Sequence, residues 1–364
     1  MPGSLHAAKS LVFIGTYTEG SDSEGIYAFR IDDESGELDR VETAGISTNP
    51  SFLALHPKKN LLFAVGETRD FNGTSSGSIA SFEIEPASGK LTEINRVSSS
   101  GGSPCHLFVD RAGKHVLVAN YHGGNVAVVS IGDDGALGQR CAFIQHEGSS
   151  VNKARQQSPH AHSINLDHAN RRAFAADLGT DELVIYDYDK EAGTLERSGA
   201  VEVAPGSGPR HLAIRPDGDF VYLLNEIKST LDVIRYDGET GACEIVQTIS
   251  TLPADYSGNN GTAEVQINPD GRFLYASNRG HDSLACFRID AGSGKLTLIE
   301  IEPTGGRAPR NFGIHPSGKF IIVANQNSDS LKVFAIDQTS GELEDTGNGA
   351  SCPKPVCVTF YQTR

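Results

Sequence analysis

The sequence predicts an all-β fold in which one four-stranded unit is repeated seven times, and three observations lead to this prediction. A Gly-x-Leu turn recurs six times, and Gly241-Cys243 forms a seventh copy with another small hydrophobe. The turns are about 51 residues apart, so seven units fill nearly all of the 364 residues. Short apolar runs rich in Val, Ile, Phe and Tyr lie between Gly and Pro turns, as in β-strands. The six Gly-x-Leu copies begin at Gly36, Gly89, Gly135, Gly193, Gly294 and Gly341.

The same segments follow one another in each unit. An entry segment such as GPRHLAIRPDG precedes an apolar run that ends in a polar residue, such as FVYLLNE. An alternating run such as SLACFRID comes next, and the Gly-x-Leu turn leads to a fourth run. Four short antiparallel strands per unit describe the blade of a β-propeller. Six blades are predicted in succession from Pro50 onward.

The seventh blade is predicted to be split between the two ends of the chain. Three of its strands fall in residues 11–42, and the fourth is PVCVTFYQ near the C-terminus. Pairing these strands closes the ring and removes the exposed sheet edges. We therefore expect a single seven-bladed propeller domain over 1–364, with residues 1–10 as a short tail. The sequence contains no Trp, which excludes the WD-type propellers.

Charge and composition bear on partners and compartment. With 31 Lys+Arg against 46 Asp+Glu, the net charge of −15 argues against nucleic-acid binding. The N-terminal LVFIG run is shorter than the apolar core of a secretory signal, and nothing approaches a membrane span. The six Cys show no zinc or redox spacing. We expect a cytoplasmic protein with reduced thiols and no membrane partner, a monomer or a weak homo-oligomer because a closed ring needs no partner.

Polar residues are predicted to converge at one mouth of the central channel. The first strand of a blade lines the channel, and the second strand runs antiparallel beside it. The start of the first strand and the end of the second strand therefore lie on the same face of the ring. The first-strand starts supply His106, His160, His162, Arg210, His211, Glu264 and Arg310. The second-strand ends supply Glu67, Asn120, Tyr121, His122, Asp177, Glu226, Asn278, Arg279, Asn325 and Gln326. A polar cluster in a concave site predicts ligand binding.

Several of these residues also have a purely structural interpretation. Turn capping is the alternative role for Asn120, Asn325, Asp177 and Glu67. Four histidines in or beside turns are expected on the surface: His56, His115, His168 and His315.

The two histidines of PHAH, His160 and His162, alternate and are predicted to share one strand face, beside Arg155. Arg210 and Arg279 present planar donors suited to carboxylate or phosphate, so a small anionic ligand is expected, with an ion pair to a Glu as the alternative. The His-x-His spacing lacks an obvious third ligand, so neither a metal nor another cofactor is predicted.

Ordered motifs along the whole chain resemble one known family. They include VANYHGGNV at 118–126, RQQSPHAH at 155–162, GPRH at 208–211 and AEVQINPDGRFLYASNRGHDSL at 263–284. From about residue 11 to 360 the chain resembles the lactonase family of seven-bladed propellers. Its best-known activity is 6-phosphogluconolactonase, and it also includes a fungal carboxy-cis,cis-muconate cyclase. The resemblance implies hydrolysis of 6-phospho-D-glucono-1,5-lactone to 6-phosphogluconate, a step of the pentose phosphate pathway.

The resemblance also implies roles for residues. The motifs place a catalytic histidine at His160 or His162, arginines at Arg210 and Arg279, and a glutamate at Glu226. The expected mechanism has a neutral histidine activating water and either Arg210 or Arg279 stabilising the oxyanion. The other arginine, together with Arg155 or Arg310, is expected to hold the phosphate, and Glu226 is expected to orient an arginine or the base. Further residues expected to line the substrate site are Arg155, His106, His122, Asp177, Glu264, Arg310 and Asn325. The alternatives are a muconate-lactonising cyclase or another lactonase on the same site, and a non-enzymatic propeller that serves as an interaction platform.

Overall fold

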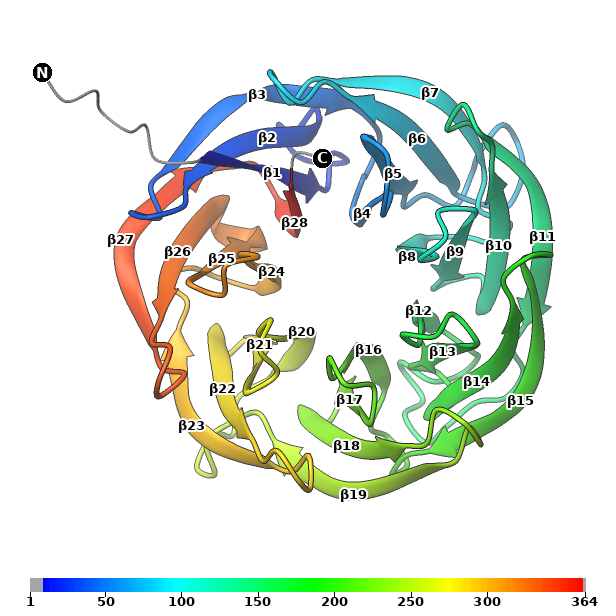
Figure 1. Cartoon of the computed structure of the whole chain (residues 1–364). Helices are drawn as coiled ribbons and strands as arrows, with labels where there is room; N and C mark the ends of the chain where they lie inside the picture. Colours follow the sequence, from blue (N-terminus) through cyan, green and yellow to red (C-terminus); the bar gives the residue numbers. More distant parts are fainter. Residues whose placement is uncertain (1–8, 363–364) are drawn as a thin grey trace, which may run out of the picture.

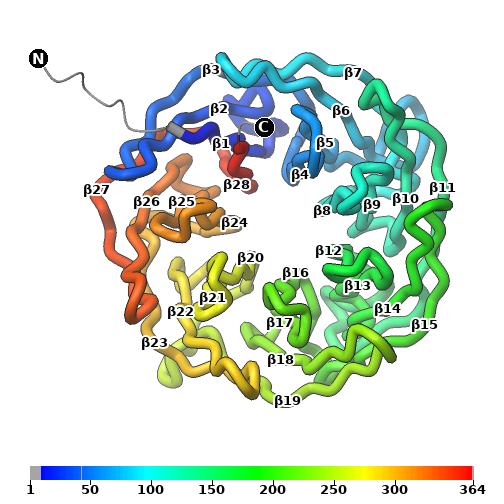
Figure 2. Tube along the Cα trace, in the orientation of Figure 1, coloured from blue at the N-terminus to red at the C-terminus, as the bar shows by residue number. Residues whose placement is uncertain are grey.

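The computed structural model describes residues 9–362, and these form seven four-stranded antiparallel sheets arranged as blades around a central channel (Figure 1). The seven-bladed propeller predicted from the repeat is thereby confirmed. The trace in Figure 2 shows that each blade extends from the channel to the outer wall of the ring. The sole helix in the described part of the chain is a short 3-10 turn, η1 (Gln326–Ser328).

Each blade has one strand at the channel, and its other strands follow outward toward the rim. From the channel outward, the split blade contains β28 (Pro355–Tyr361), β1 (Lys9–Thr16), β2 (Gly25–Asp32) and β3 (Leu38–Ile46). The second blade contains β4 (Leu53–Leu55), β5 (Leu61–Gly66), β6 (Ser78–Ile84) and β7 (Leu91–Ser98). The third contains β8 (Pro104–Val109), β9 (His115–Asn120), β10 (Asn125–Ile131) and β11 (Leu137–Gln145). The fourth contains β12 (Ala161–Leu166), β13 (Arg172–Asp177), β14 (Glu182–Asp189) and β15 (Thr194–Glu202).

The remaining three blades follow the same order. The fifth contains β16 (Pro209–Ile214), β17 (Phe220–Asn225), β18 (Thr230–Tyr236) and β19 (Cys243–Ser250). The sixth contains β20 (Gly261–Ile267), β21 (Phe273–Arg279), β22 (Ser283–Ile289) and β23 (Leu296–Pro303). The seventh contains β24 (Pro309–Ile314), β25 (Phe320–Asn325), β26 (Ser330–Ile336) and β27 (Leu343–Ser351).

The ring closes through the predicted split blade. β28 pairs antiparallel with β1, with Val12 opposite Phe360 and Ile14 opposite Val358. The predicted N-terminal tail of residues 1–10 extends too far, because Lys9 and Ser10 already belong to β1. The rest of that predicted tail, 1–8, lies outside the described residues.

The repeated Gly-x-Leu turn has a steric cause. All seven glycines of these turns have φ between 68° and 84°, a left-handed conformation that L-residues rarely adopt. A Cβ on Gly341 would also come within 2.3 Å of the Phe273 ring on the neighbouring blade. The residue two positions on, Leu343, is buried between blades. Each turn therefore needs both a glycine and a following hydrophobe.

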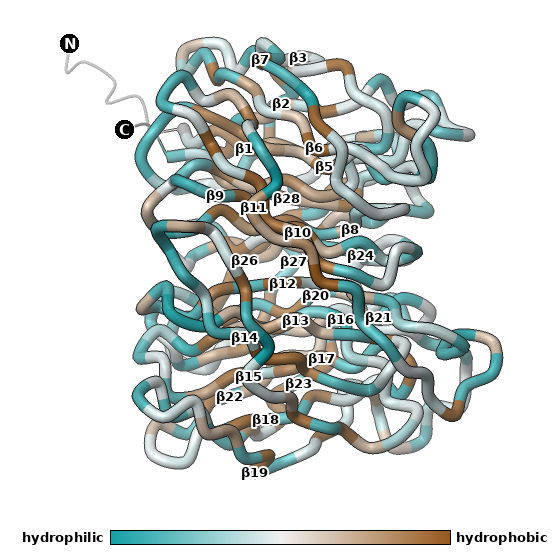
Figure 3. Tube along the Cα trace, turned by 90° about the vertical axis from the view of Figure 1, so that its right-hand side faces the viewer, coloured by the Kyte–Doolittle hydropathy of each residue, from teal (hydrophilic) through white to brown (hydrophobic). Residues whose placement is uncertain are grey.

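The hydrophobic core lies between adjacent blades. One cluster joins Phe220 and Tyr222 of the fifth blade to Leu274 and Phe287 of the sixth. Figure 3 shows hydrophobic residues along the strands and hydrophilic ones in many of the connecting loops. Within residues 9–362 no helix has the length and apolar character of a membrane span. All six cysteines carry free thiols.

The expectation that four turn histidines lie on the surface is correct for His168 and wrong for His56, His115 and His315, which are buried. The reason is that the turn of one blade packs against the next. His56 Nδ1 accepts hydrogen bonds from the backbone N–H groups of Lys58 and Lys59, and its Nε2 donates to the Gly113 carbonyl at 3.1 Å. The imidazole thus caps its own turn and joins it to the neighbouring blade.

Candidate active site

The inner strands bring the predicted polar residues to one end of the channel. Pro209 at the start of β16 lies opposite Asn225 at the end of β17, and Ala161 at the start of β12 lies opposite Asp177 at the end of β13. First-strand starts and second-strand ends therefore share one face of the ring, as the sequence predicted.

A β-bulge at the start of five inner strands (β8, β12, β16, β20 and β24) sets which side chains face the channel. A bulge adds one residue and breaks the alternation of side chains. As a result, the consecutive residues Arg210 and His211 both contact polar side chains around the channel: Arg210 binds Glu226 after β17, and His211 contacts Glu264 of β20 and His162 of β12. The extra residue is Cys105 in β8, His162 in β12, Arg210 in β16 and Arg310 in β24. In β20 the irregularity lies within Ala263–Glu264.

Glu226 is the centre of a cluster of guanidinium groups from neighbouring segments. It directly follows β17, and its side chain is 8% exposed. Arg210 Nε lies 3.0 Å and Arg279 Nη2 3.1 Å from its Oε2. Arg155, from the loop before β12, donates from Nη2 to Oε1 at 2.7 Å. The sequence-predicted arginines and glutamate are therefore in mutual contact.

The guanidinium groups of this cluster hold Glu226 ionised. Burial alone would raise the pKa of Glu226, but the three guanidinium groups, Arg279 foremost, outweigh burial and hold that pKa well below its usual range. The pKa of Arg210 is lowered to about 10 by burial and by the neighbouring charges of Arg279 and Arg310. Arg210 is still a cation at neutral pH. The cluster therefore carries an excess of positive charge inside an acidic protein.

His160 lies at the rim of this cluster in a defined tautomer. Its ring stacks on Tyr121 with 4.4 Å between centroids, and its Nδ1 lies 2.9 Å from the Tyr121 carbonyl oxygen. A carbonyl only accepts, so Nδ1 carries the proton and Nε2 has a free lone pair. His160 precedes β12, so the prediction that it shares a strand face with His162 is wrong.

His162 is the bulge residue of β12 and lies deeper. Its Nε2 is 3.9 Å from Glu226 Oε2, and its Nδ1 is 3.6 Å from Cys105 Sγ. Burial and the positive charge of Arg210 lower the pKa of His162 well below its usual value. His162 is consequently neutral and a weak base.

Below this cluster lies a second layer of buried side chains, His106, His211 and Glu264. The ring of His211 is 5.3 Å, centroid to centroid, from His106 and equally far from His162. His211 Nδ1 lies 3.2 Å from Glu264 Oε2, which also accepts a hydrogen bond from Asn311. Burial raises the pKa of Glu264 to about 8, so this carboxyl is protonated at neutral pH. The layer borders a cavity of about 410 Å³ in the other half of the channel.

Arg310 reaches the mouth through Tyr17, a residue that sequence reasoning did not select. Its Nη2 donates to the Tyr17 hydroxyl at 2.8 Å, and that hydroxyl donates to Glu67 Oε2 at 2.8 Å. Ser51 also donates to Glu67 Oε2. Tyr17 follows β1, the second strand of the split blade. Applying the second-strand rule to that blade would have found it.

Two residues predicted to bind substrate instead hold loops. Asp177 is fully buried, and its Oδ1 accepts hydrogen bonds from the backbone N–H groups of His160 and Gly179, each at 2.8 Å. Asn325 is equally buried and donates to the Thr304 carbonyl at 3.2 Å. Both occupy the capping role that the sequence offered as the alternative. Asp177 contributes to the site by fixing the loop that carries His160.

Comparison with known proteins settles the family. The profile described as "Lactonase, 7-bladed beta-propeller" matches residues 11–360. The chain belongs to this lactonase family. It is 35% identical over 352 residues to a 6-phosphogluconolactonase of Bacillus subtilis, covering 97% of this chain and 98% of that one. A 6-phosphogluconolactonase of Formosa agariphila is 33% identical, covering 83% of this chain and 85% of that one.

A solved structure agrees with this assignment. The periplasmic gluconolactonase PpgL of Pseudomonas aeruginosa matches with a TM-score of 0.91 and 35% identity, covering 98% of this chain and 99% of that one. Family and relatives together make this protein an enzyme, a hydrolase that acts on lactones. A non-enzymatic platform, one of the sequence alternatives, is thereby set aside.

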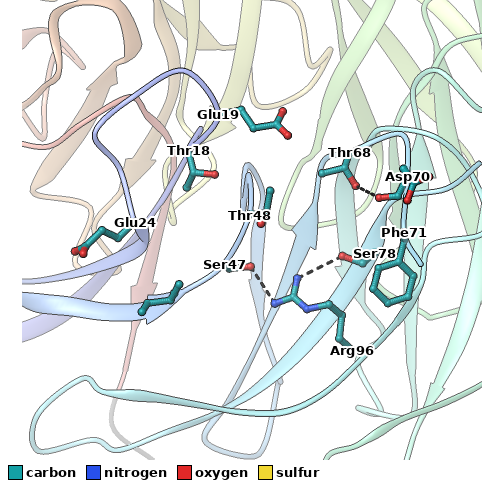
Figure 4. Close-up of a pocket in the computed structure, with 11 residues that line it drawn as sticks. Thr18, Glu19, Glu24, Ser47, Thr48, Thr68, Asp70, Phe71, Ser78 and Arg96 are labelled. Carbon is teal, nitrogen blue, oxygen red and sulfur yellow. Dashed lines mark hydrogen bonds between the residues drawn. The ribbon is translucent and has the colours of Figure 1, made fainter. Parts of the chain in front are cut away.

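The mouth of the lactonase holds a cavity of about 650 Å³, lined by Tyr17, Glu67, Arg69, His122 and Lys354 among others. Beside it, sharing Glu19 and Thr68, is an outer groove of about 690 Å³ between the split blade and the next one (Figure 4). Among the described residues no group of three His, Cys, Asp or Glu is arranged to hold a metal ion.

Proposed function

We propose that this lactonase hydrolyses 6-phospho-D-glucono-1,5-lactone to 6-phosphogluconate. The observation that carries the proposal is the cluster of guanidinium groups around Glu226, with the unprotonated Nε2 of His160 at its rim. Hydrolysis of an anionic lactone needs a base for water, a stabilised oxyanion and cations for the substrate. The relatives named 6-phosphogluconolactonase support the same substrate.

His160 is the base in this proposal. Its Nε2 takes a proton from water as the water oxygen bonds to the lactone carbonyl carbon. The bond from that carbon to the ring oxygen then breaks, and the proton passes to the ring oxygen, which becomes a hydroxyl. The new carboxylic acid ionises, and the proton it releases goes to solvent. His162 is less suited to this step because the pKa of its buried ring is lowered well below the usual value.

Arg210 and Arg279 stabilise the oxyanion. Arg210 donates a hydrogen bond from Nε to Glu226 and one from Nη1 to the Ala263 carbonyl. Its Nη2 remains to donate to the substrate. Arg279 donates a hydrogen bond from Nε to the Gly261 carbonyl, and its Nη2 is paired with Glu226. Its Nη1 remains to donate to the substrate. Glu226 thus fixes both groups without neutralising all of their charge. Preorganised donors of this kind stabilise the charge that develops on the carbonyl oxygen.

The test is hydrolysis of freshly generated 6-phosphogluconolactone, corrected for spontaneous ring opening. Wild-type protein is expected to accelerate the reaction, and His160→Ala and Arg210→Ala are expected to lower kcat. If His160→Ala, His162→Ala and Arg210→Ala all kept wild-type rates, the site would be assigned wrongly.

Unphosphorylated gluconolactone is a second candidate, since the Pseudomonas aeruginosa neighbour is named a periplasmic gluconolactonase. Carboxymuconate is a third, because the resemblance extends to the fungal cyclase branch through the motifs that carry Arg210 and Glu226. Comparing turnover of the three substrates decides between them. Activity on the phosphorylated substrate would support a role in the pentose phosphate pathway and a location in the cytoplasm. Cell fractionation tests the location.

A further inference from the structure

The channel mouth contains two cationic side chains and a histidine that do not belong to the Glu226 cluster. Arg69 follows β5 by three residues, His122 follows β9 by two, and Lys354 immediately precedes β28. All three line the mouth cavity of about 650 Å³. They come from three neighbouring blades.

The positive charge of Arg69 has no carboxylate partner among the described residues. Its Nη2 donates to Nε2 of His122, and His122 Nδ1 donates to the Ser103 hydroxyl at 2.9 Å. His122 is therefore neutral and leaves the charge of Arg69 in place. Lys354 Nζ is 3.7 Å from Asp329 Oδ1, a longer contact than a hydrogen bond.

The carboxylates that line the same cavity are already engaged. Glu67 Oε2 accepts hydrogen bonds from Tyr17 and Ser51. Glu19 Oε2 accepts one from Asn49 Nδ2 at 2.9 Å. The two negative charges of Glu19 and Glu67 balance the two positive charges of Arg69 and Lys354 in the cavity lining. Among the described residues no carboxylate lies within hydrogen-bond distance of either cation, so the N–H groups of Arg69 and Lys354 can donate to the oxygen atoms of an anion.

The cavity lies within reach of the reacting end of a bound lactone. The ring centroid of His122 is 6.3 Å from that of His160, the proposed base. On the other side, the Tyr17 hydroxyl accepts a hydrogen bond from Arg310 and belongs to the cavity wall. A sugar lactone whose carbonyl carbon lies beside His160 would therefore extend its opposite end toward this cavity.

The neighbouring outer groove does not suit an anion. It is lined by the carboxylates Glu19, Glu24 and Asp70 (Figure 4). Its one arginine, Arg96, forms an ion pair with Glu93 at 2.7 Å and donates to Ser47 and Ser78.

We propose that Arg69 and Lys354, with His122 holding Arg69 in place, form the subsite for the substrate's terminal phosphate. This replaces Arg155 and Arg310, whose guanidinium groups are bound to Glu226 and Tyr17. The inference rests on the proposed function, since it specifies which end of the sugar lactone is recognised. A phosphate monoester offers several acceptor oxygens and up to two charges, which a guanidinium and an ammonium together match.

The test compares Arg69→Gln and Lys354→Gln with wild type on phosphorylated and unphosphorylated gluconolactone. Arg69→Gln is expected to raise KM for the phosphorylated lactone about tenfold to a hundredfold, because a charge-assisted hydrogen bond is lost. Lys354→Gln should raise it less, and KM for the unphosphorylated lactone should stay the same in both variants. Equal effects on the two lactones, or none, would overturn the proposal.

Arg235→Gln is the matched control. It removes the same charge from an exposed arginine near the far end of β18, where the partner is Glu244. It should leave both KM values unchanged, and thermal melting of all variants checks that they fold.

Binding measurements separate this inference from the proposed function. Calorimetry with 6-phosphogluconate and with gluconate needs no turnover. If wild type hydrolyses neither lactone, the proposed function fails. The subsite is then still supported if Arg69→Gln weakens 6-phosphogluconate binding alone, and refuted if it does not.

Discussion

Glu226 and Glu264 are two buried carboxyls in one channel, and they are in opposite charge states. Their side chains are equally buried, at 8% exposure each. Glu226 contacts three guanidinium groups and is ionised, whereas the partners of Glu264 are the Asn311 amide, a backbone N–H and the His211 ring. Burial raises the pKa of Glu264 to about 8, while arginine charges reverse that effect at Glu226.

The comparison shows that neighbouring cations, rather than depth, decide the charge of a buried carboxyl. The bulges produce the difference. They direct Arg210 toward Glu226 and leave the next residue, His211, facing Glu264. The layer near the mouth is therefore ionic and suited to an anion, and the layer below it is neutral.

The largest effect is expected from removing the ionised member of the pair. Glu226→Gln leaves three buried or half-buried guanidinium groups without their carboxylate. The free energy of unfolding should fall by about 3–5 kcal/mol, and hydrolysis should fall with it because Arg210 and Arg279 lose their anchor. Urea unfolding monitored by circular dichroism measures the first quantity. A variant as stable as wild type would mean that Glu226 does not neutralise the cluster.

The next effect concerns His160 and His162, the two histidines of the predicted site. His160→Gln retains a donor toward the Tyr121 carbonyl but removes the base, so kcat should fall by about 10²–10⁴. His162→Gln should lower kcat by less than about tenfold, because a histidine with so low a pKa contributes little as a base. Initial rates at saturating substrate measure both variants. The reverse order would assign the base to His162.

The last effect is the pH dependence of stability that Glu264 confers. The folded protein retains a proton at Glu264 up to about pH 8, while the unfolded chain loses it near pH 4.3. The contribution of Glu264 to stability therefore falls as pH rises between these values, by about 3–4 kcal/mol from pH 5 to 8. Urea unfolding of wild type and Glu264→Gln at several pH values should show this loss in wild type alone. Parallel curves would mean that Glu264 is ionised in the folded state.

The fold was predictable because its signal is local. A left-handed glycine such as Gly341, followed two positions on by a hydrophobe such as Leu343, recurs in every blade, so the repeat is visible in the sequence. The gathering of Arg210, Arg279 and Glu226 was also predictable, since it follows from which strand ends share a face.

Other features of the site depend on contacts between blades, which one repeat does not encode. The bulge that places His162 deeper than His160 is a matter of strand register. The raised pKa of Glu264 depends on its burial among neighbouring blades. Arg69 lies in a loop beyond the strand end, so a rule based on strand ends stopped at Glu67.

The closure of the ring through β28 and β1 has a consequence for how the enzyme matures. Tyr17 directly follows the first strand and Lys354 directly precedes the last, yet both line the same mouth cavity. During synthesis these two residues are separated by nearly the whole chain until the final strand leaves the ribosome. The mouth cavity is therefore complete only once β28 has paired with β1, and binding of a phosphorylated ligand would report that the two ends of the polypeptide have joined.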